Sequence, residues 1–598
     1  MKNGEWSLRQ QRDENAILVR LFMRLLPVQA MIIAMGSINA IIDGVIAARF
    51  IDTSTVGVIG LYYAMLRILE ASGNVILGGV AVLSGKYMGS GRVDQTRGVI
   101  SLGMALSFII GAFLTIASFA VPGVIADLLG ANETLKAPLC TYIMGYAVGI
   151  IPQLLGQQFA SSLQLERKEK VGHTAVVVMI ICNVAMDLLL VVVLKKGVFG
   201  LVLATTAANW AYFLVVSFPY VLRKAQLLPS LKLIEWKNAW PLVKIGFPAA
   251  LLVICLAVRS IVINRLLLTY SGDDGLSALS AYNMLSGLIL AIAIGSGILT
   301  RMLSSVFIGE DNREGLKGLF RFIWTYMMIL MSAVGVLVIL LAPFLSRIFF
   351  ADTSSELFHM ARQLFVIAGI GVPLSMACIN FSSYYQAAGH LLFANLISVV
   401  DGLISAMIPA IILAPRLGAL GVWLSFLIGL FITLGCSVLY PIIRCRRIPR
   451  NLDEWMLLPP EFGSADHHVH HIRKIEHVTE TAASVQEFCD RHGMIHRKGF
   501  YTGLCLEEIA GNIVRHGFHA DNRKHDIEVR VICKNESDVI LRIKDDCRPF
   551  NPHEWHEMTS VGDDPFKNIG IRLVYGLADE VEYQNMLGLN VLTIQISG

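Results

Sequence analysis

The sequence predicts an α-helical membrane protein with twelve transmembrane helices in two parallel six-helix repeats, followed by a C-terminal α/β sandwich. Hydrophobic residues make up 55% of the 598 residues and the mean hydropathy is +0.62, which is too apolar for a soluble chain of this length. The apolar runs end near Ile443, and twelve of the fifteen histidines lie beyond Asp466. A membrane part is therefore expected to precede a separate soluble part.

The membrane part is predicted to cross the bilayer twelve times, because each apolar run is long enough to span ~30 Å of hydrocarbon. The expected spans are residues 17–46, 53–84, 95–120, 137–164, 172–194, 198–222, 240–270, 276–307, 316–348, 361–388, 390–413 and 418–443. Lys and Arg are frequent in every second connection, so the positive-inside rule predicts that both termini are cytoplasmic. The first sixteen residues are polar and predict no cleavable signal peptide, so we expect a multi-pass protein of the cell (inner or plasma) membrane.

The two halves of the membrane part repeat each other at an offset of about 220 residues. Gly89 and Gly98 of the first half match Gly309 and Gly318 of the second. Each half holds an even number of spans, so both halves begin on the same side and the repeat is parallel, with a substrate path expected between the halves. The expected divisions are an N-terminal segment (1–16), an N-lobe (17–222), a C-lobe (223–444), a linker (445–475) and a C-terminal domain (476–598).

Acidic residues inside the spans indicate a polar cavity, because a charge within the bilayer is costly. Asp43 lies in the first span, Asp187 in the fifth and Asp401 in the eleventh. Asn183 precedes Asp187 by one helical turn, so the two side chains face the same way. Carboxylates with a neighbouring amide can hold a proton or a hard cation such as Na⁺. Asp43 alternatively lies at the membrane interface, and a structural role for Asp401 stays equally open.

Residues 17–443 resemble the multidrug and toxic compound extrusion (MATE) family. The resemblance rests on the order of four stretches, SINAIIDGVIAARFIDTSTVGVIGL, QFASSLQLERKEKVGHTAVVVMIICNVAMDLLLV, LSAYNMLSGLILAIAIGSGI and LGALGVWLSF. It implies a two-lobed antiporter that exports organic compounds, chiefly organic cations, by alternating access driven by H⁺ or Na⁺. It also implies a cation site in the N-lobe formed by Asp43, Asn183, Asp187 and Thr205, with Thr206 as the alternative to Thr205.

The segment 445–475 is rich in Arg, Pro and His and predicts a solvated, flexible linker. Its histidine cluster at 467–471 is interpreted as part of that linker, since no acid or Cys ligand shares its spacing. Beyond it the pattern predicts an α/β sandwich with a mixed sheet. The expected elements are helices at 478–492, 498–517 and 568–578, and strands at 526–534, 538–545, 580–584 and 589–596.

Three segments of the C-terminal domain carry polar residues in a pattern typical of a binding site. Glu508, Asn512 and His516 are four residues apart, which places them on one face of a helix. Asp545 stands at the predicted end of a strand, where a carboxylate can accept a hydrogen bond from an exocyclic amine. Gly570 opens a predicted helix, whose backbone N–H groups can meet phosphate.

Together and in this order, these segments resemble the GHKL-type ATPase domain of gyrase, Hsp90 and histidine kinases, and most closely that of anti-sigma-factor serine kinases. The shared motifs are E-x-x-x-N-x-x-x-H, D-x-x-x-P-F and N-x-G. The resemblance implies binding of ATP and Mg²⁺. Glu508 would be the general base, Asn512 the Mg²⁺ ligand, Asp545 the adenine-binding residue and Gly570 part of the phosphate lid, with His516 also beside the cofactor.

Two features leave alternatives open. Glu507 competes as the base, although it points about 100° away from the Asn512 face of the helix. Cys547 stands where the family usually has a glycine, two residues after the adenine-binding aspartate, so its side chain could crowd adenine.

Two functions follow as hypotheses. The first is a cation-coupled antiporter whose ATP-binding domain regulates transport or signalling. The second is a membrane sensor serine kinase whose transporter-like half acts as a receptor, with an anti-anti-sigma-like protein as partner. ATP-driven export is not expected, because the tail has no G-x-x-x-x-G-K-[ST] motif, and no nucleic acid is expected as a partner.

Overall fold

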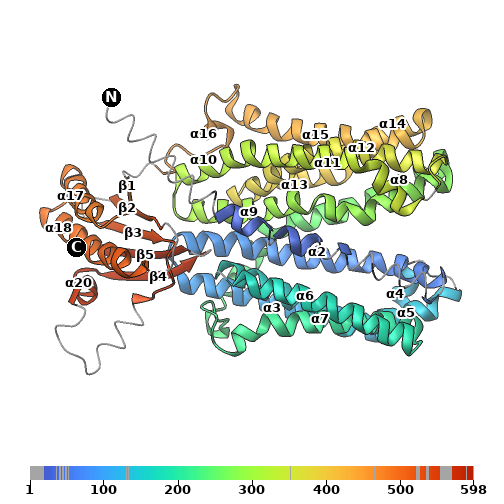
Figure 1. Ribbon diagram of the computed structural model, residues 1–598, viewed down its shortest axis with the longest axis horizontal. Helices are drawn as coiled ribbons and strands as arrows, with labels where there is room; N and C mark the ends of the chain where they lie inside the picture. The colour runs from blue at the N-terminus through green and yellow to red at the C-terminus, as the bar shows by residue number, and fades with distance from the viewer. Residues whose placement is uncertain are drawn as a thin grey trace.

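The computed structural model shows a long helical body with a mixed α/β domain at one end (Figure 1). It describes residues 53–129, 131, 133–166, 168–350, 352–463, 467–519, 525–533, 538–552, 569–586 and 589–596, with parts of 19–51. Asp43, predicted for the cation site, and Asn568, the first residue of the N-x-G motif, lie outside the described residues.

The N-lobe is a bundle of long helices, because its apolar runs have no break other than short polar turns. Its helices are α2 (Thr53–Gly89), α3 (Val93–Ala120), α4 (Pro122–Leu128), α5 (Glu133–Leu165), α6 (Glu169–Asp187) and α7 (Gly197–Val221). A π-helical turn at Leu188–Val193 follows α6 directly.

The C-lobe repeats this arrangement. Its helices are α8 (Ala239–Ile289), α9 (Ala291–Gly309), α10 (Arg313–Phe322), α11 (Met328–Phe349), α12 (Glu356–Ala388), α13 (Leu391–Val399), α14 (Ser405–Leu417) and α15 (Ala419–Cys445). Further π-helical turns lie at Ile323–Met327 and Val400–Ile404.

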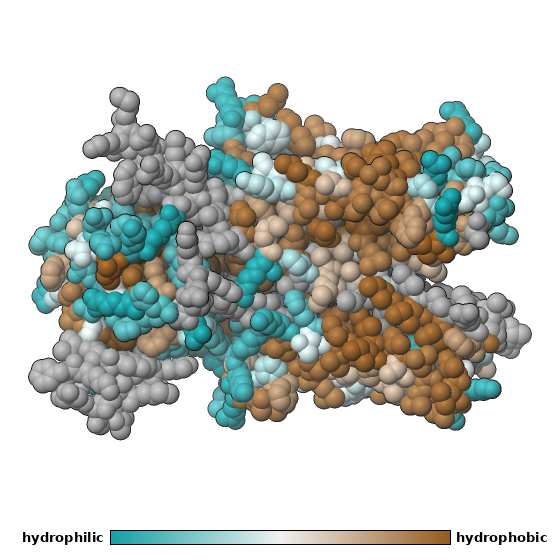
Figure 2. Space-filling view, viewed as in Figure 1, coloured by the Kyte–Doolittle hydropathy of each residue, from teal (hydrophilic) through white to brown (hydrophobic). Residues whose placement is uncertain are grey.

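Eleven helices among the described residues are long and apolar enough to cross a membrane. Gly272 has a left-handed backbone (φ 63°), so α8 holds the seventh span and the start of the eighth, which continues as α9. With the partly described first span, these helices account for the twelve expected crossings. Figure 2 shows apolar side chains over the sides of both lobes and polar residues at the two ends, as a bilayer requires.

The two lobes touch along α2, which packs on α8 and α9 of the C-lobe. A Cβ added to Gly246 would overlap the carbonyl oxygen of Val75, and one added to Gly309 would overlap that of Lys86. The backbones are therefore in direct contact over the half of α2 that ends at Gly89, which leaves no room between the lobes there.

The C-terminal domain is a two-layer α/β sandwich. Its elements are β1 (His467–Ile472), α17 (Glu476–Arg491), α18 (His496–Asn512), a π-helical turn (Ile513–Gly517), β2 (Ile527–Cys533), β3 (Val539–Asp545), α20 (Ile569–Leu577), β4 (Glu580–Met586) and β5 (Leu589–Ile596). Inward side chains of the strands, such as Val529 and Leu541, form one core with Val485 and Leu506 of α17 and α18.

The prediction of a mixed sheet was wrong. The strand order is β1-β2-β3-β5-β4 and every pair among the described strands is antiparallel. A helix between β3 and β4 suggested a parallel crossover. The chain instead runs through α20 to the edge strand β4, and β5 then returns antiparallel between β4 and β3.

The prediction that 445–475 is a solvated linker was also wrong. Residues 467–472 form the edge strand β1, where His468 stacks on Phe488 with ring centroids 5.1 Å apart. Upstream, the segment packs on the C-lobe: the Tyr384 hydroxyl donates to the carbonyl oxygen of Met456 over 2.7 Å. Apolar side chains interleaved among the Pro and Arg residues attach the connection to α12, so it is not a free tether.

Candidate functional site

The predicted general base and the predicted phosphate-lid glycine lie together. α18 and α20 pack side by side on the sheet, and a Cβ added to Gly570 would overlap the Oε2 of Glu508. Glu508 is half-buried, and so is its competitor Glu507. The contact with the first turn of α20 belongs to Glu508, which favours Glu508 as the residue facing a bound phosphate group.

Asn512 ends the regular part of α18 and is half-buried. The next turn, Ile513–Gly517, is π-helical, so the spacing of four no longer corresponds to one α-helical turn. His516 lies on this wider turn and is exposed. Glu508 and Asn512 therefore share a regular helical face, whereas His516 is displaced from it.

Asp545 is held by a buried hydrogen-bond network at the end of β3. Its Oδ1 accepts from the backbone N–H of Cys547 over 2.9 Å and from Nδ2 of Asn590 over 2.7 Å. The Oδ1 of Asn590 in turn accepts from the Tyr583 hydroxyl and from Asn585, each over 2.8 Å. Burial raises the pKa of Asp545, and the hydrogen bonds from Asn590 and Cys547 oppose that shift. The Asp545 carboxylate is thus held in one orientation at the end of β3.

Asn590 was not predicted as a site residue. It pairs directly with Asp545 across β3 and β5 and is 5% exposed. The one signal in the sequence is an asparagine near the start of a mostly apolar strand, LNVLTIQI. That signal is weak, because Asn is also common in turns.

Cys547 occupies the position next to the aspartate where crowding was expected. Its thiol contributes a hydrogen bond to Asp545, and a Cβ added to Gly517 would lie 3.0 Å from its Sγ. The side chain is 3% exposed. It therefore fills space between the Asp545 carboxylate and the turn that follows Asn512.

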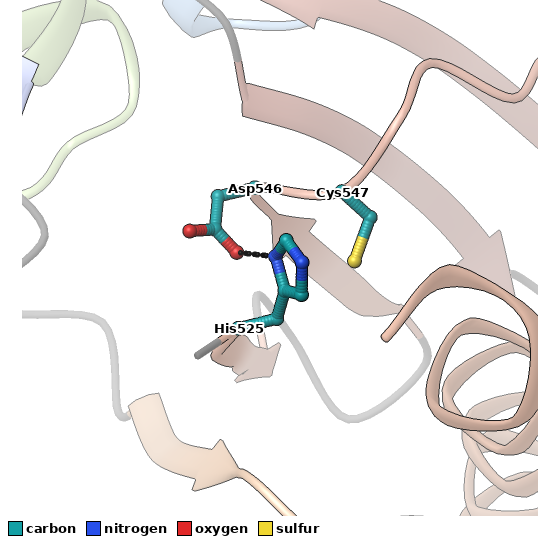
Figure 3. A group of neighbouring side chains, drawn as sticks. All are labelled: His525, Asp546 and Cys547. Carbon is teal, nitrogen blue, oxygen red and sulfur yellow. Dashed lines mark hydrogen bonds and ion pairs between the residues drawn. The ribbon is translucent and has the colours of Figure 1, made fainter. Parts of the chain in front are cut away.

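A potential metal-binding group borders this thiol. His525, Asp546 and Cys547 offer N, O and S donors that all lie within 4.8 Å of one another (Figure 3). Nδ1 of His525 and Oδ1 of Asp546 are 2.9 Å apart. Structural zinc sites use four such ligands. Among the described residues no further His, Cys, Asp or Glu joins these three, so the group is described here as an ion pair beside a thiol.

The predicted nucleotide residues fit the group that the motifs imply. Gly570 opens α20 against the carboxylate of Glu508, and Asp545 provides a carboxylate held by hydrogen bonds. The Asn512 side chain supplies an amide oxygen of the kind that Mg²⁺ accepts. The thiol of Cys547 is the feature that departs from this fit.

In the N-lobe, Asn183 and Asp187 are both 0% exposed near the end of α6. Neither polar atom of the Asn183 side chain has a hydrogen-bond partner among the described residues. The π-helical turn begins directly after Asp187, and such turns often mark functional positions. A fully buried acid next to an unsatisfied amide can hold a proton or a cation, and buried polar groups without partners are uncommon in helix packing.

The two threonine candidates differ in their contacts. The hydroxyl of Thr206 donates to the carbonyl oxygen of Gly145 on α5 over 2.9 Å and so takes part in helix packing. The hydroxyl of Thr205 donates to Leu201, one turn back on its own helix, over 3.3 Å. Thr205 is therefore the better candidate for the cation site.

In the C-lobe, Asp401 lies on the π-helical turn that follows α13. The hydroxyl of Thr433 donates to its Oδ1 over 3.2 Å, and Nη1 of Arg259 donates to its backbone carbonyl over 3.0 Å. Asp401 is thus already bonded by neighbouring helices, which supports the structural role left open for it.

Comparisons with known proteins identify both parts. The MatE family model matches residues 28–189 and 248–412, and the histidine kinase-like ATPase domain matches residues 473–596. The probable multidrug resistance protein YoeA of Bacillus subtilis (strain 168) is 22% identical over 407 residues, covering 65% of this chain and 86% of YoeA. The multidrug export protein MepA of Staphylococcus saprophyticus is 24% identical over 414 residues, covering 66% and 88%.

Solved structures show the same fold for the membrane part. A mutant of the Vibrio cholerae MATE transporter VcmN aligns with a TM-score of 0.66 at 14% identity, covering 71% of this chain and 97% of that one. An outward-facing MATE transporter of the MOP superfamily aligns with a TM-score of 0.66 at 16% identity, covering 71% and 95%. The chain is therefore a multi-pass membrane protein that belongs to the MATE family of multidrug transporters and carries a histidine kinase-like ATPase domain at its C-terminal end.

Proposed function

We propose that the protein is an antiporter that exports organic compounds in exchange for Na⁺ or H⁺, and that its C-terminal domain binds ATP with Mg²⁺ and regulates transport. The observation that carries the coupling is the fully buried pair of Asn183 and Asp187. The relatives with 86–88% coverage are named as multidrug resistance and export proteins, which supports an organic substrate.

Flux in proteoliposomes tests this coupling. Asp187→Asn keeps the size of the side chain and removes its charge, so it should abolish uptake or efflux driven by an imposed ion gradient while the protein still inserts. Asp401→Asn is the matched control, because Asp401 is bonded within the C-lobe; it should retain most of the flux. Equal flux in wild type and Asp187→Asn would remove Asp187 from the mechanism.

The nucleotide site is proposed to use Asp545 for adenine, Asn512 for Mg²⁺ and Gly570 for the phosphates, with Glu508 as the general base. The ATP supplies a transferable phosphoryl group when it is bound. Asn512→Ala should abolish Mg²⁺-dependent ATP binding by the full-length protein in calorimetry, because it removes the amide oxygen. Binding that is unchanged in this variant would exclude Asn512 as the metal ligand.

ATP is proposed to regulate transport rather than to power it, because the membrane part holds its own buried acid and amide. Glu508→Ala should remove phosphoryl transfer or hydrolysis and leave ion-driven flux measurable. Flux that falls in proportion to ATPase activity and needs no ion gradient would contradict this division.

The second candidate is a sensor serine kinase that acts on an anti-anti-sigma-like protein. The contact between Glu508 and Gly570 favours it, since a base beside the phosphate group can activate a serine hydroxyl. Transfer of phosphate to such a partner, changing with the transported compound, would favour this candidate over regulation of transport alone. Both readings put the tail in the cytoplasm, as the distribution of Lys and Arg favours.

A further inference from the structure

One face of the C-terminal sheet carries buried charges that the nucleotide site does not use. Helices cover the other face, and an antiparallel sheet of this kind usually leaves its second face to water. That second face, here called the outer face, presents Glu528, Arg530, Arg542 and Lys544 on β2 and β3. These residues are 8%, 3%, 6% and 7% exposed. Charged residues are buried this deeply only when paired, so another part of the molecule covers them.

The loop after α9 of the C-lobe makes the first set of contacts. Nζ of Lys544 lies 2.7 Å from Oε2 of Glu310, and Nη2 of Arg530 donates to Oδ1 of Asn312 over 2.9 Å. The side chains of Lys544 and Glu310 are 9% and 2% exposed. Burial acts to raise the pKa of Glu528, but Lys544 and Arg530 outweigh it and lower that pKa. The outer face is therefore paired with charges of the C-lobe as well as with its own.

The loop after α2 of the N-lobe makes the second set of contacts. Gly91 turns this loop with φ 86°, and a Cβ added there would lie 2.7 Å from Oε2 of Glu582 on β4. Val591 of β5 belongs to the same apolar cluster as Met88 and Val306, from α2 and α9. One face of one sheet thus touches loops of both lobes, and Figure 1 shows the C-terminal domain at this end of the helical body.

These two loops are equivalent in the internal repeat. Gly89 and Gly309 end α2 and α9, and Gly91 and Asp311 both have a positive φ two residues later. The same helices pack backbone to backbone at this end, since a Cβ on Gly309 would overlap the carbonyl oxygen of Lys86. Alternating access moves one repeat against the other, so opening this end must separate the two loops.

The nucleotide site lies on the same strands as these contacts. Lys544, which pairs with Glu310, is followed by Asp545, whose side chain is on the opposite face. Asn590, which orients Asp545, is followed by Val591, which packs against the lobes. A movement of Asp545 or Asn590 would therefore also move the neighbouring Lys544 or Val591, which contact the lobes.

We propose that the outer face of the sheet is a clamp that ties the loop after α2 to the loop after α9, so that the pathway opens on the tail side only when the clamp releases. This inference rests on one part of the proposed function, the regulation of transport by the C-terminal domain, and it names how that domain would control alternating access. The contact itself requires neither ATP nor an ion gradient.

The clamp is built to be reversible. Arg530 and Arg542 are directly opposite each other across β2 and β3. Nε of Arg530, and Nε and Nη1 of Arg542, have no hydrogen-bond partner among the described residues. Buried donors without partners and adjacent like charges destabilise the docked state. Release of the sheet from the loops would expose these groups to water and remove that destabilisation.

Hydrogen–deuterium exchange of the full-length protein tests the clamp directly. Lys544→Glu places like charges against Glu310, so exchange at 90–92 and 310–312 should rise at least threefold. The charge-swapped double variant, Lys544→Glu with Glu310→Lys, should restore the protection of both loops from hydrogen exchange. This result separates loss of the contact from misfolding. Arg491→Glu reverses a charge on the exposed face of α17 and is the matched control, with exchange at both loops as in wild type.

Flux measured on the same variants tests the functional part. Release of the clamp should raise the rate of tail-side opening, so Lys544→Glu should change ion-driven flux at least twofold. The charge-swapped double variant should reverse this change. If Lys544→Glu leaves hydrogen exchange at both loops unaltered, the contact is overturned, whatever the flux. Raised exchange with unaltered flux would overturn the clamp as a control of opening and leave the docking intact. Absence of ion-driven flux in wild type would instead contradict the proposed antiport, while the exchange result would still decide the contact.

Discussion

At the scale of single residues, Cys547 is the main departure from a glycine-containing adenine site. Its thiol bonds to Asp545 and lies against Gly517, so it takes up volume beside the carboxylate that would receive adenine. Gly517 closes the π-helical turn after Asn512. The thiol therefore lies between Asp545 and the turn that follows Asn512.

We expect Cys547→Gly to strengthen ATP binding. Removing the thiol frees the space beside Asp545, and a gain of about tenfold in affinity corresponds to ~1.4 kcal/mol. Calorimetry on the full-length protein measures it. Cys547→Ser keeps the size of the side chain and should show no gain. A glycine variant with the wild-type affinity would show that Cys547 does not limit binding.

At the scale of elements, β1 shows how a histidine-rich segment becomes part of a sheet. Alternation turns His468 and His470 toward α17, where the Nε2 of His468 lies 2.9 Å from the Ser484 hydroxyl. Burial, together with the neighbouring His468 and His471, lowers the pKa of His470 to about 4. The edge strand is therefore stable with a neutral imidazole.

The stability of the C-terminal domain should fall as the pH falls from 7 to 5. His470 has its folded pKa below the unfolded value of 6.5, so the unfolded state binds more protons between these two values and stability is lost as pH drops through that window. The expected loss is roughly 2 kcal/mol. Thermal unfolding of wild type and His470→Phe measures it, since the phenylalanine variant should lose most of this pH dependence. His496→Phe, an exposed position, should keep it, and equal pH dependence in all three proteins would contradict the assignment.

At the scale of the whole molecule, the tail and the two lobes form one body joined through charges. Burial, with Glu580 and Asp94, raises the pKa of Glu582 to about 7 against the opposing effect of Arg542 and Arg92. Burial and Asp94 act only while the tail is docked. The docked state therefore binds more protons than the released state between the ordinary glutamate pKa of 4.5 and about 7.

Docking should consequently weaken as the pH rises through about 7. Exchange of the amides at 90–92 should rise between pH 6.5 and 8 beyond the intrinsic effect of pH on exchange. Glu582→Gln cannot ionise and should remain docked across this range, while Glu480→Gln on the exposed surface of α17 should behave as wild type. Identical exchange in wild type and Glu582→Gln at each pH would contradict a role for this carboxyl group.

Much of the fold could be predicted because its signals are local. Runs of about twenty apolar residues define a span wherever they occur, so eleven spanning helices among the described residues match the expected pattern. The strand and helix limits of the C-terminal domain also agree within a few residues, because period-two and period-3.6 patterns are written along the chain. The order of Glu508, Asn512, Asp545 and Gly570 identified the domain before any contact was known.

The sequence by itself determined the membrane part, its internal repeat and the ATPase-type domain, and it supplied the residues proposed for both sites. Only the tertiary structure decided that β1 joins the sheet, that the linker packs on α12 and that the outer face covers both lobes. The physical reason is that alternating charges such as Arg542 and Lys544 have the same pattern on a solvated face as on a buried one. The pairing of Lys544 with Glu310 shows that this face is buried. The two residues are more than two hundred positions apart in the chain, so no local pattern predicts their contact.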